Sequence, residues 1–208
     1  MIDLIQRRRA MMVSDAQPTP PIPPEYAEEE YISISGKTKR IETDFVPTQL
    51  CRVEIEFKGT ATNSSKAGSL FGSRNGWNNN SFYFKTGVSS GTATDLTANM
   101  GFKTERTQIV NVNASDKHIY GIDAGRFYID NETIGTYNDT ITASYPIYIV
   151  CVNSAGTPSG SSPIGNLYYC KCWDDQGELV RDYKPVTRIA DSAKGLYDVV
   201  TQTFTILK

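Results

Sequence analysis

The stretch that most limits the fold is residues 145–206, because it consists almost entirely of strand-length segments separated by turns. Residues 147–152 (IYIVCV) form a nearly continuous apolar run, which favours a central strand covered on both faces. Residues 178–186 (ELVRDYKPV) follow the turn residues DDQG and are expected to return as the partner of the strand before them. In that preceding strand, LYYCKCW at 167–173, alternation places three side chains on the expected core face: Tyr168, Cys170 and Cys172. The end of the chain therefore predicts antiparallel β-sheet.

The clearest half-buried strand lies earlier, at residues 51–59 (CRVEIEFKG). Apolar and charged residues alternate there, so one face is expected to pack into a core. Glu54 and Glu56 lie on the charged face, and we interpret them as a solvated or groove-lining pair rather than a catalytic pair. The composition, with 39% hydrophobic residues, 16 Gly and 4 Met, argues against a helical bundle. The chain is predicted to be all-β with one substantial core.

The near balance of positive and negative charges argues against a polyanionic partner. The chain has 21 basic and 23 acidic residues and a formal net charge of -2, so nucleic-acid binding by phosphate neutralisation is not expected. We interpret the basic run Arg7–Arg9 as a solvated or partner-facing end of a helix. No apolar run approaches the roughly 20 residues of a membrane span, and Ala10–Val13 is too short for the apolar core of a secretory signal.

Cysteine, histidine and aspartate residues give no pattern of a metal or catalytic centre. Cys51, Cys151, Cys170 and Cys172 lie in apolar, strand-like contexts without a CxxC spacing and are expected to be reduced core residues. His118 is the one histidine in the chain, which leaves little for a histidine-based metal site or a Ser/His/Asp relay. No calcium-ligand spacing selects the available aspartates, Asp95, Asp139, Asp174 and Asp175. No cofactor or metal is therefore predicted.

The first 25 residues read as a tail on a domain that spans residues 26–208. Residues 1–16 predict a docking peptide that forms a short helix on a partner, with a frayed terminus as the alternative. Its apolar and basic contacts are expected from Ile2, Leu4, Ile5, Arg8, Met11 and Met12. Residues 17–25 (QPTPPIPPE) are rich in proline, which predicts a semi-rigid spacer, or alternatively a proline-motif ligand.

A loop with the sequence NGWNNN, between two expected strands, is the predicted ligand site. An indole ring stacks on the apolar face of a sugar while neighbouring amides bond its hydroxyls. The expected ligand-binding residues are Arg74, Trp77, Asn78, Asn79 and Asn80. The alternative is that Trp77 folds back onto the edge of the sandwich.

The chain resembles the laminin-G or concanavalin-A-like jelly-roll modules that recur in gut bacteria and their phages. The resemblance lies in VEIEF at 53–57, LFGSR at 70–74, FYF at 82–84, GRFYIDNETI at 125–134, PIYIVCVNSAGTPS at 146–159, LYYCKCWDDQGELVRDYKPV at 167–186 and GLYDVVTQTF at 195–204. It implies a sandwich of two antiparallel sheets. Because this fold hosts lectins, glycan hydrolases and structural modules, the resemblance does not fix an activity.

We expect a non-catalytic, lectin-like surface module that its N-terminal tail anchors to a larger assembly. A phage virion accounts for both the surface character and the lack of a secretory signal, which predicts the virion surface as its location, with the bacterial cytoplasm before assembly as the alternative. Expected partners are the virion or surface assembly and host or mucosal glycans, without nucleic acid or a membrane span, and homo-oligomerisation stays open. The alternatives are a glycoside hydrolase on the same fold, or a purely structural cement protein without a glycan ligand.

Overall fold

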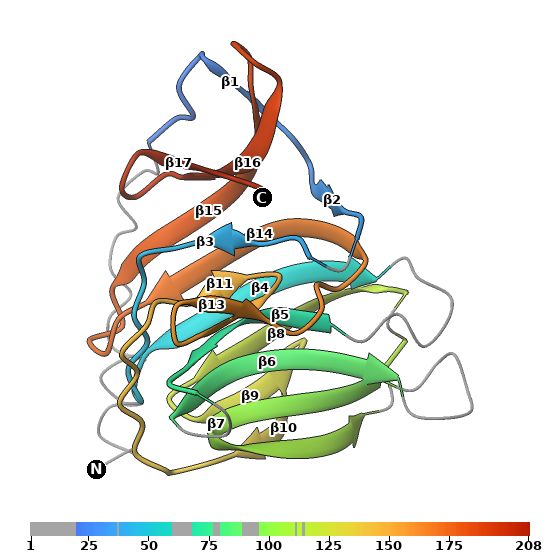
Figure 1. Cartoon of the computed structure of the whole chain (residues 1–208), viewed down its shortest axis with the longest axis vertical. Coiled ribbons are helices and arrows are strands. Elements are labelled where there is room, and N and C mark those ends of the chain that lie inside the picture. Colours follow the sequence, from blue (N-terminus) through green and yellow to red (C-terminus); the bar gives the residue numbers. More distant parts are fainter. Residues whose placement is uncertain are drawn as a thin grey trace.

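Two β-sheets packed face to face make up this protein (Figure 1). The computed structural model describes residues 20–36, 38–59, 68–76, 80–88, 96–110, 112–113 and 115–208. These residues form strands and turns and contain no helix. The predicted all-β, two-sheet jelly-roll sandwich is confirmed. Pairing is antiparallel throughout, except for one two-residue parallel ladder in the smaller sheet.

The larger sheet has ten strands. Along its main path they are β10 (Glu132–Thr136), β9 (Arg126–Ile129), β8 (Lys117–Asp123), β4 (Arg52–Gly59), β14 (Gly165–Trp173), β15 (Leu179–Arg188), β16 (Ala193–Asp198) and β17 (Thr203–Ile206). Two short strands join from the start of the domain: β1 (Tyr26–Glu28) pairs with β15, and β2 (Ile32–Ile34) pairs with β14.

The smaller sheet has seven strands. Five of them follow the order β13 (Thr157–Ser159), β12 (Val152–Ser154), β5 (Gly68–Arg74), β11 (Tyr148–Ile149) and β3 (Ile41–Glu42). The other two extend from β5, which pairs with β6 (Ser81–Val88), and β6 pairs in turn with β7 (Leu96–Val110).

The core fills the space between the sheets and is rich in aromatic rings. The ring of Phe84 in β6 lies 5.5 Å from that of Tyr120 in β8, and the rings of Phe102 in β7 and Phe127 in β9 meet edge to face at 6.2 Å. Such contacts between sheets add to the free energy gained by burying apolar area. All four cysteines are buried, as expected.

The alternation predicted for residues 167–173 holds only in part. Cys170 and Cys172 face the core, but Leu167 is fully buried whereas Tyr168 is half-buried on the outer face. A bulge between Leu167 and Tyr169 in the pairing of β14 with β4 causes this exchange. One extra residue in a strand moves each side chain before it to the opposite face of the sheet. The expected core position of Tyr168 was therefore wrong.

The predicted central strand at 147–152 is two short strands with a kink between them. Every residue in this range is buried, as expected. The chain turns at Val150, whose φ of 55° is unusual for a β-branched residue. Before the kink β11 runs antiparallel to β5, and after it β12 runs parallel to the same strand.

The described part of the predicted spacer, residues 20–25, lies against the sandwich. Ile22 packs on a second apolar cluster, made by Val186, Tyr197 and Val199. The carbonyl of Glu25 accepts a hydrogen bond from the backbone of Ile189. The predicted docking peptide, residues 1–16, lies outside the described residues. Among the described residues, no helix is long and apolar enough to cross a membrane.

Candidate functional site: a pocket where two strands diverge

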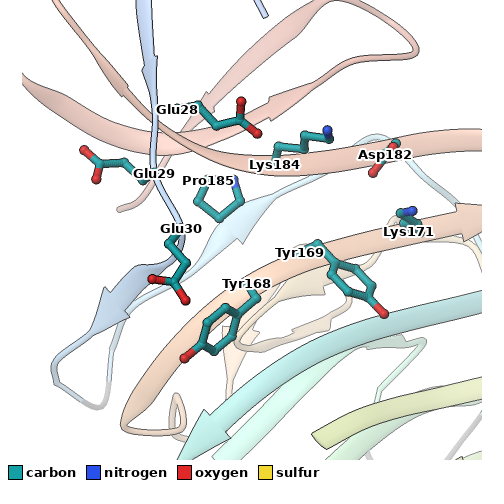
Figure 2. Close-up of a pocket in the computed structure, with 9 residues that line it drawn as sticks. All are labelled: Glu28, Glu29, Glu30, Tyr168, Tyr169, Lys171, Asp182, Lys184 and Pro185. Atoms are coloured by element: carbon teal, nitrogen blue, oxygen red, sulfur yellow. The ribbon is translucent and has the colours of Figure 1, made fainter. Parts of the chain in front are cut away.

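A pocket lies where β14 and β15 separate. The second half of β14 pairs with the start of β15, from Trp173 to Cys170, whereas its first half pairs with β2 instead. The second half of β15 pairs with β1. Residues 29–31 connect β1 to β2 and cross the gap between the two diverging strands, as Figure 2 shows. We call the space that they enclose the fork pocket.

The fork pocket has a volume of about 250 Å³, which is just below the roughly 300 Å³ at which ligand pockets begin. Its walls come from three segments of the chain (Figure 2). They are Glu28, Glu29 and Glu30 from the crossing segment, Tyr168, Tyr169 and Lys171 from β14, and Asp182, Lys184 and Pro185 from β15. The pocket thus combines two phenol rings with carboxylates and ammonium groups.

The bulge in β14 places both tyrosines on the outer face of the larger sheet. The ring of Tyr168 has the ammonium of Lys117 4.7 Å from its centre and lies 5.6 Å from the ring of Tyr31. The Tyr169 hydroxyl donates a hydrogen bond of 2.8 Å to Oε1 of Glu54. Burial, together with this bond to the carboxylate, raises the pKa of Tyr169, so the phenol stays protonated.

Glu54 anchors a hydrogen-bond network beside the pocket. Its Oε2 accepts a bond of 2.8 Å from the Tyr128 hydroxyl and also pairs with the guanidinium of Arg52. Arg52 lies 4.3 Å from the ring centre of Trp173, within cation–π range. Burial alone would raise the pKa of Glu54, but the bonds from Arg52, Tyr169 and Tyr128 outweigh it and lower this pKa. Glu54 is therefore an ionised acceptor that holds Tyr169 in place.

Gly121 makes this network possible. It lies directly opposite both Glu54 in β4 and Tyr128 in β9. A Cβ atom at this position would lie 2.1 Å from Cζ of Tyr128. Without that atom, the tyrosine ring crosses β8 and its hydroxyl reaches Glu54.

Asp182 is the buried acceptor of the pocket. Its residue exposure is 3%, and in the part of the chain that the structure describes its Oδ1 atom has no hydrogen-bond partner. Burial raises the pKa of this carboxyl, whereas the nearby charges of Lys171 and Lys184 act in the opposite direction. The backbone of Asp182 is fixed, because its amide donates a bond of 2.9 Å to Oδ1 of Asp198.

Arg74 and Asn80, the two described residues of the predicted ligand site, do not line the fork pocket. Arg74 ends β5 in the smaller sheet, is 4% exposed, and donates hydrogen bonds to Ser154 and Ser159 at 3.1 and 2.6 Å. Asn80 directly precedes β6 in the same sheet and has a φ of 46°. Trp77, Asn78 and Asn79 lie outside the described residues, so the ligand site predicted there stays a prediction.

Sequence reasoning missed the fork pocket because its residues form no motif. The available signal was indirect: Glu54 was expected on a solvated or groove-lining face, and alternation within residues 167–173 leaves Tyr169 and Lys171 on the face opposite Cys170 and Cys172. Nothing in the sequence marked Asp182. Among the described residues, no cluster of three or more His, Cys, Asp or Glu side chains is arranged to hold a metal ion.

No protein-family model matches the sequence, and no curated protein matches it either. Among solved structures, the chain is similar to the CBM40 of the Ruminococcus gnavus IT-sialidase, with a TM-score of 0.47 and 14% identity over 70% of this chain and 90% of that one. A heptameric SAP-like pentraxin from Limulus polyphemus gives a TM-score of 0.48 and 15% identity, over 74% and 76% of the two chains. A native glycosidic hydrolase gives 0.42 and 14%, over 72% and 90%. None of these similarities determines what this chain binds.

Proposed function

We propose that this protein is a non-catalytic, lectin-like module that binds a carbohydrate in the fork pocket. The observation that carries the proposal is the combination, in one pocket, of two tyrosine rings with hydrogen-bond donors and acceptors. A sugar ring has apolar C–H faces and a rim of hydroxyls, so it needs both kinds of contact. Tyr168 and Tyr169 supply the first kind, and Asp182, Lys171 and Lys184 supply the second.

Rigid placement of these groups supports binding. Six of the nine wall residues, including Tyr169, Lys171 and Asp182, lie within the long strands β14 and β15 rather than in loops. The carboxylate of Glu54 fixes the Tyr169 hydroxyl, and Asp198 fixes the backbone of Asp182. Groups that are already ordered lose little conformational entropy when a ligand binds.

Hydrolysis is the second candidate, because Glu54 and Asp182 place two carboxyl groups on the strands that flank β14. Both lie opposite Lys171, one in each neighbouring strand. Two inter-strand steps of about 4.8 Å place their Cα atoms about 10 Å apart. However, both carboxylate oxygens of Glu54 already accept hydrogen bonds, and Glu54 does not line the pocket. This engagement favours binding over catalysis.

Calorimetry or a glycan array with two single variants tests the location of the site. Tyr168→Ala removes a wall of the fork pocket and is expected to weaken binding about tenfold, which corresponds to the roughly 1.4 kcal/mol of an aromatic contact. Trp77→Ala is the matched control and should bind like the native protein. Loss of binding in the Trp77 variant alone would move the site to the predicted loop, and no binding by any variant or by the native chain would end the lectin proposal.

An assay of reducing-sugar release on the same glycans tests the absence of catalysis. We expect no release above the buffer control. Release that disappears in Glu54→Gln, while the folded fraction of that variant is unchanged, would establish a hydrolase instead.

The remaining part of the proposal concerns assembly and rests on the sequence pattern alone. We propose that residues 1–16 dock the module onto a larger surface assembly, such as a phage virion, and that the sandwich faces the medium. A chain without these residues keeps Ile22 and Tyr26, which pack on the sandwich. It should bind glycan normally but fail to join particles; full incorporation of the shortened chain would disprove tail-mediated docking.

A further inference from the structure

We propose that the fork pocket selects a neutral sugar with two adjacent free hydroxyls over an acidic or a cationic sugar, and that Asp182 is the residue that determines this specificity. The inference rests on the proposed carbohydrate-binding function and adds the chemical class of the ligand.

The carboxylate of Asp182 provides an unpaired hydrogen-bond acceptor in the pocket. Asp182 is 97% removed from solvent, lines the pocket, and has one carboxylate oxygen without a partner among the described residues. A buried oxygen that lacks a donor costs free energy, and native proteins rarely keep one without a reason. A ligand that donates a hydrogen bond at this point removes that cost, so the pocket is matched to a hydroxyl or an N–H group.

The ammonium groups of Lys171 and Lys184 are the hydrogen-bond donors near this acceptor. Lys171 lies directly opposite Asp182 in the neighbouring strand, and Lys184 follows on the same face of β15, two residues further along the chain. The charges of both lysines reach Asp182 through space, without a hydrogen bond to its Oδ1 atom. A hydroxyl both donates and accepts, whereas a carboxylate accepts and an ammonium donates. Two adjacent hydroxyls of one sugar ring therefore satisfy Asp182 and one lysine at the same time.

The charged side chains of the pocket wall disfavour binding of charged sugars. In Figure 2 the carboxylates of Glu28 and Glu30 lie beside β15 and Tyr168, whereas that of Glu29 points away and accepts a hydrogen bond of 2.7 Å from Thr187. With Asp182, the wall therefore presents three carboxyl groups against the two ammonium groups of Lys171 and Lys184. A ligand carboxylate would add a like charge to this excess. A ligand ammonium that approached Asp182 would meet Lys171 and Lys184 on either side. A neutral polyol avoids both repulsions.

Matched sugars test the selection directly on the full chain. The neutral probes are the methyl glycosides of glucose, galactose and mannose. The acidic probes are the uronate forms of the same three glycosides, in which carbon 6 is a carboxylate. The cationic probes are their 2-amino forms. Binding is followed by calorimetry or by chemical-shift changes. We expect at least one neutral glycoside to bind about tenfold or more tightly than its uronate and its amino counterpart.

Asp182→Asn tests the role of the residue, because it keeps the side-chain shape and removes the charge. We expect at least about a tenfold loss in affinity for the neutral glycoside, which corresponds to a hydrogen bond to a charged group. Lys184→Gln is a second variant on the same wall and should weaken the neutral glycoside while leaving the melting temperature unchanged. A melting curve of each variant separates loss of binding from loss of folding.

The outcomes separate the two proposals. If a uronate or an amino sugar binds as well as its neutral form, and Tyr168→Ala still weakens that binding, the selection proposed here is wrong but the carbohydrate site stands. If the neutral glycoside binds Asp182→Asn as tightly as the native chain, Asp182 does not determine specificity. If neither these probes nor a glycan array shows any binding, the proposed function itself fails, and the inference fails with it.

Discussion

Glu54 illustrates how a single buried charge organises the outer face of a sheet. Its exposure is only 7%, yet it stays ionised because Arg52, Tyr128 and Tyr169 all donate to it. A buried carboxylate without such partners would be protonated or destabilising. Its neighbour Glu56, two residues along the same face, has one lysine 3.4 Å away and is more exposed. Two glutamates that look equivalent in sequence therefore differ in their contribution to stability.

Replacing Glu54 with glutamine should lower the free energy of unfolding by about 2 to 3 kcal/mol, since hydrogen bonds to a charged group are lost inside the protein. Urea unfolding of both proteins measures this difference. Glu56→Gln is the matched control and should cost less than about 1 kcal/mol, as for an exposed ion pair. Equal costs for the two variants would mean that the network around Glu54 adds nothing to stability.

The pH dependence of stability should separate Glu54 from Asp182. The pKa of Glu54 is lowered in the folded state, so its contribution is complete above the ordinary value of 4.5 and disappears as pH falls through the lower folded value. The pKa of Asp182 is raised, so its charge opposes folding at neutral pH, and this penalty is absent below the ordinary value of 3.8.

Urea unfolding at pH 7 and at pH 3 tests the predicted direction of the pH dependence for both residues. Glu54→Gln should be less stable than the native chain at pH 7, with a smaller gap at pH 3. Asp182→Asn should be at least as stable as the native chain at pH 7, and any advantage should vanish at pH 3. A gap for Glu54→Gln that grows in acid would contradict the assignment of its pKa.

At the scale of elements, β14 is the strand on which both the core and the site depend. It pairs with β4 along its whole length, and with β2 and then β15 on its other side. Its bulge places Leu167 in the core and Tyr168 in the pocket wall. Alternation predicted the core positions of Val53, Ile55 and Phe57 in β4 correctly, because that strand has no such irregularity. It did not predict the burial of Glu54, which is 7% exposed and does not line the pocket. It failed at Leu167 and Tyr168, because a bulge is set by the pairing partner and leaves no mark in a run of seven residues.

Burial of the cysteine side chains, two of which lie on the core face of β14, predicts that the thiols react poorly in the native protein. Cys170 and Cys172 are fully buried, and burial raises the pKa of Cys172 and of Cys151. A buried, protonated thiol is a poor nucleophile. We expect no reaction of the four cysteines with Ellman's reagent in the native protein and full reaction in urea. Ser33→Cys, on an exposed position of β2, is the positive control; rapid labelling of the native chain without that change would contradict the predicted burial.

At the scale of the whole molecule, the fold was predictable from sequence but the site was not. Local patterns identify strands, turns and an apolar face, and these suffice for a two-sheet sandwich. The fork pocket needs Tyr26 to pair with Arg188 and Ile32 with Leu167, which joins the start of the domain to its end. No local pattern encodes such pairings, because they depend on which strand edges are left free once the rest of the sheet has formed.

The pairing of β4 with β14 also has a consequence for translation. A ribosome makes β4 early and β8 soon afterwards, so one edge of β4 is covered while synthesis continues. Its other edge waits for β14, which is more than 100 residues further along the chain. An unpaired strand edge recruits strands from other chains, and nascent chains that expose one aggregate readily. One edge of the strand that carries Glu54 therefore stays unpaired until β14 has left the ribosome.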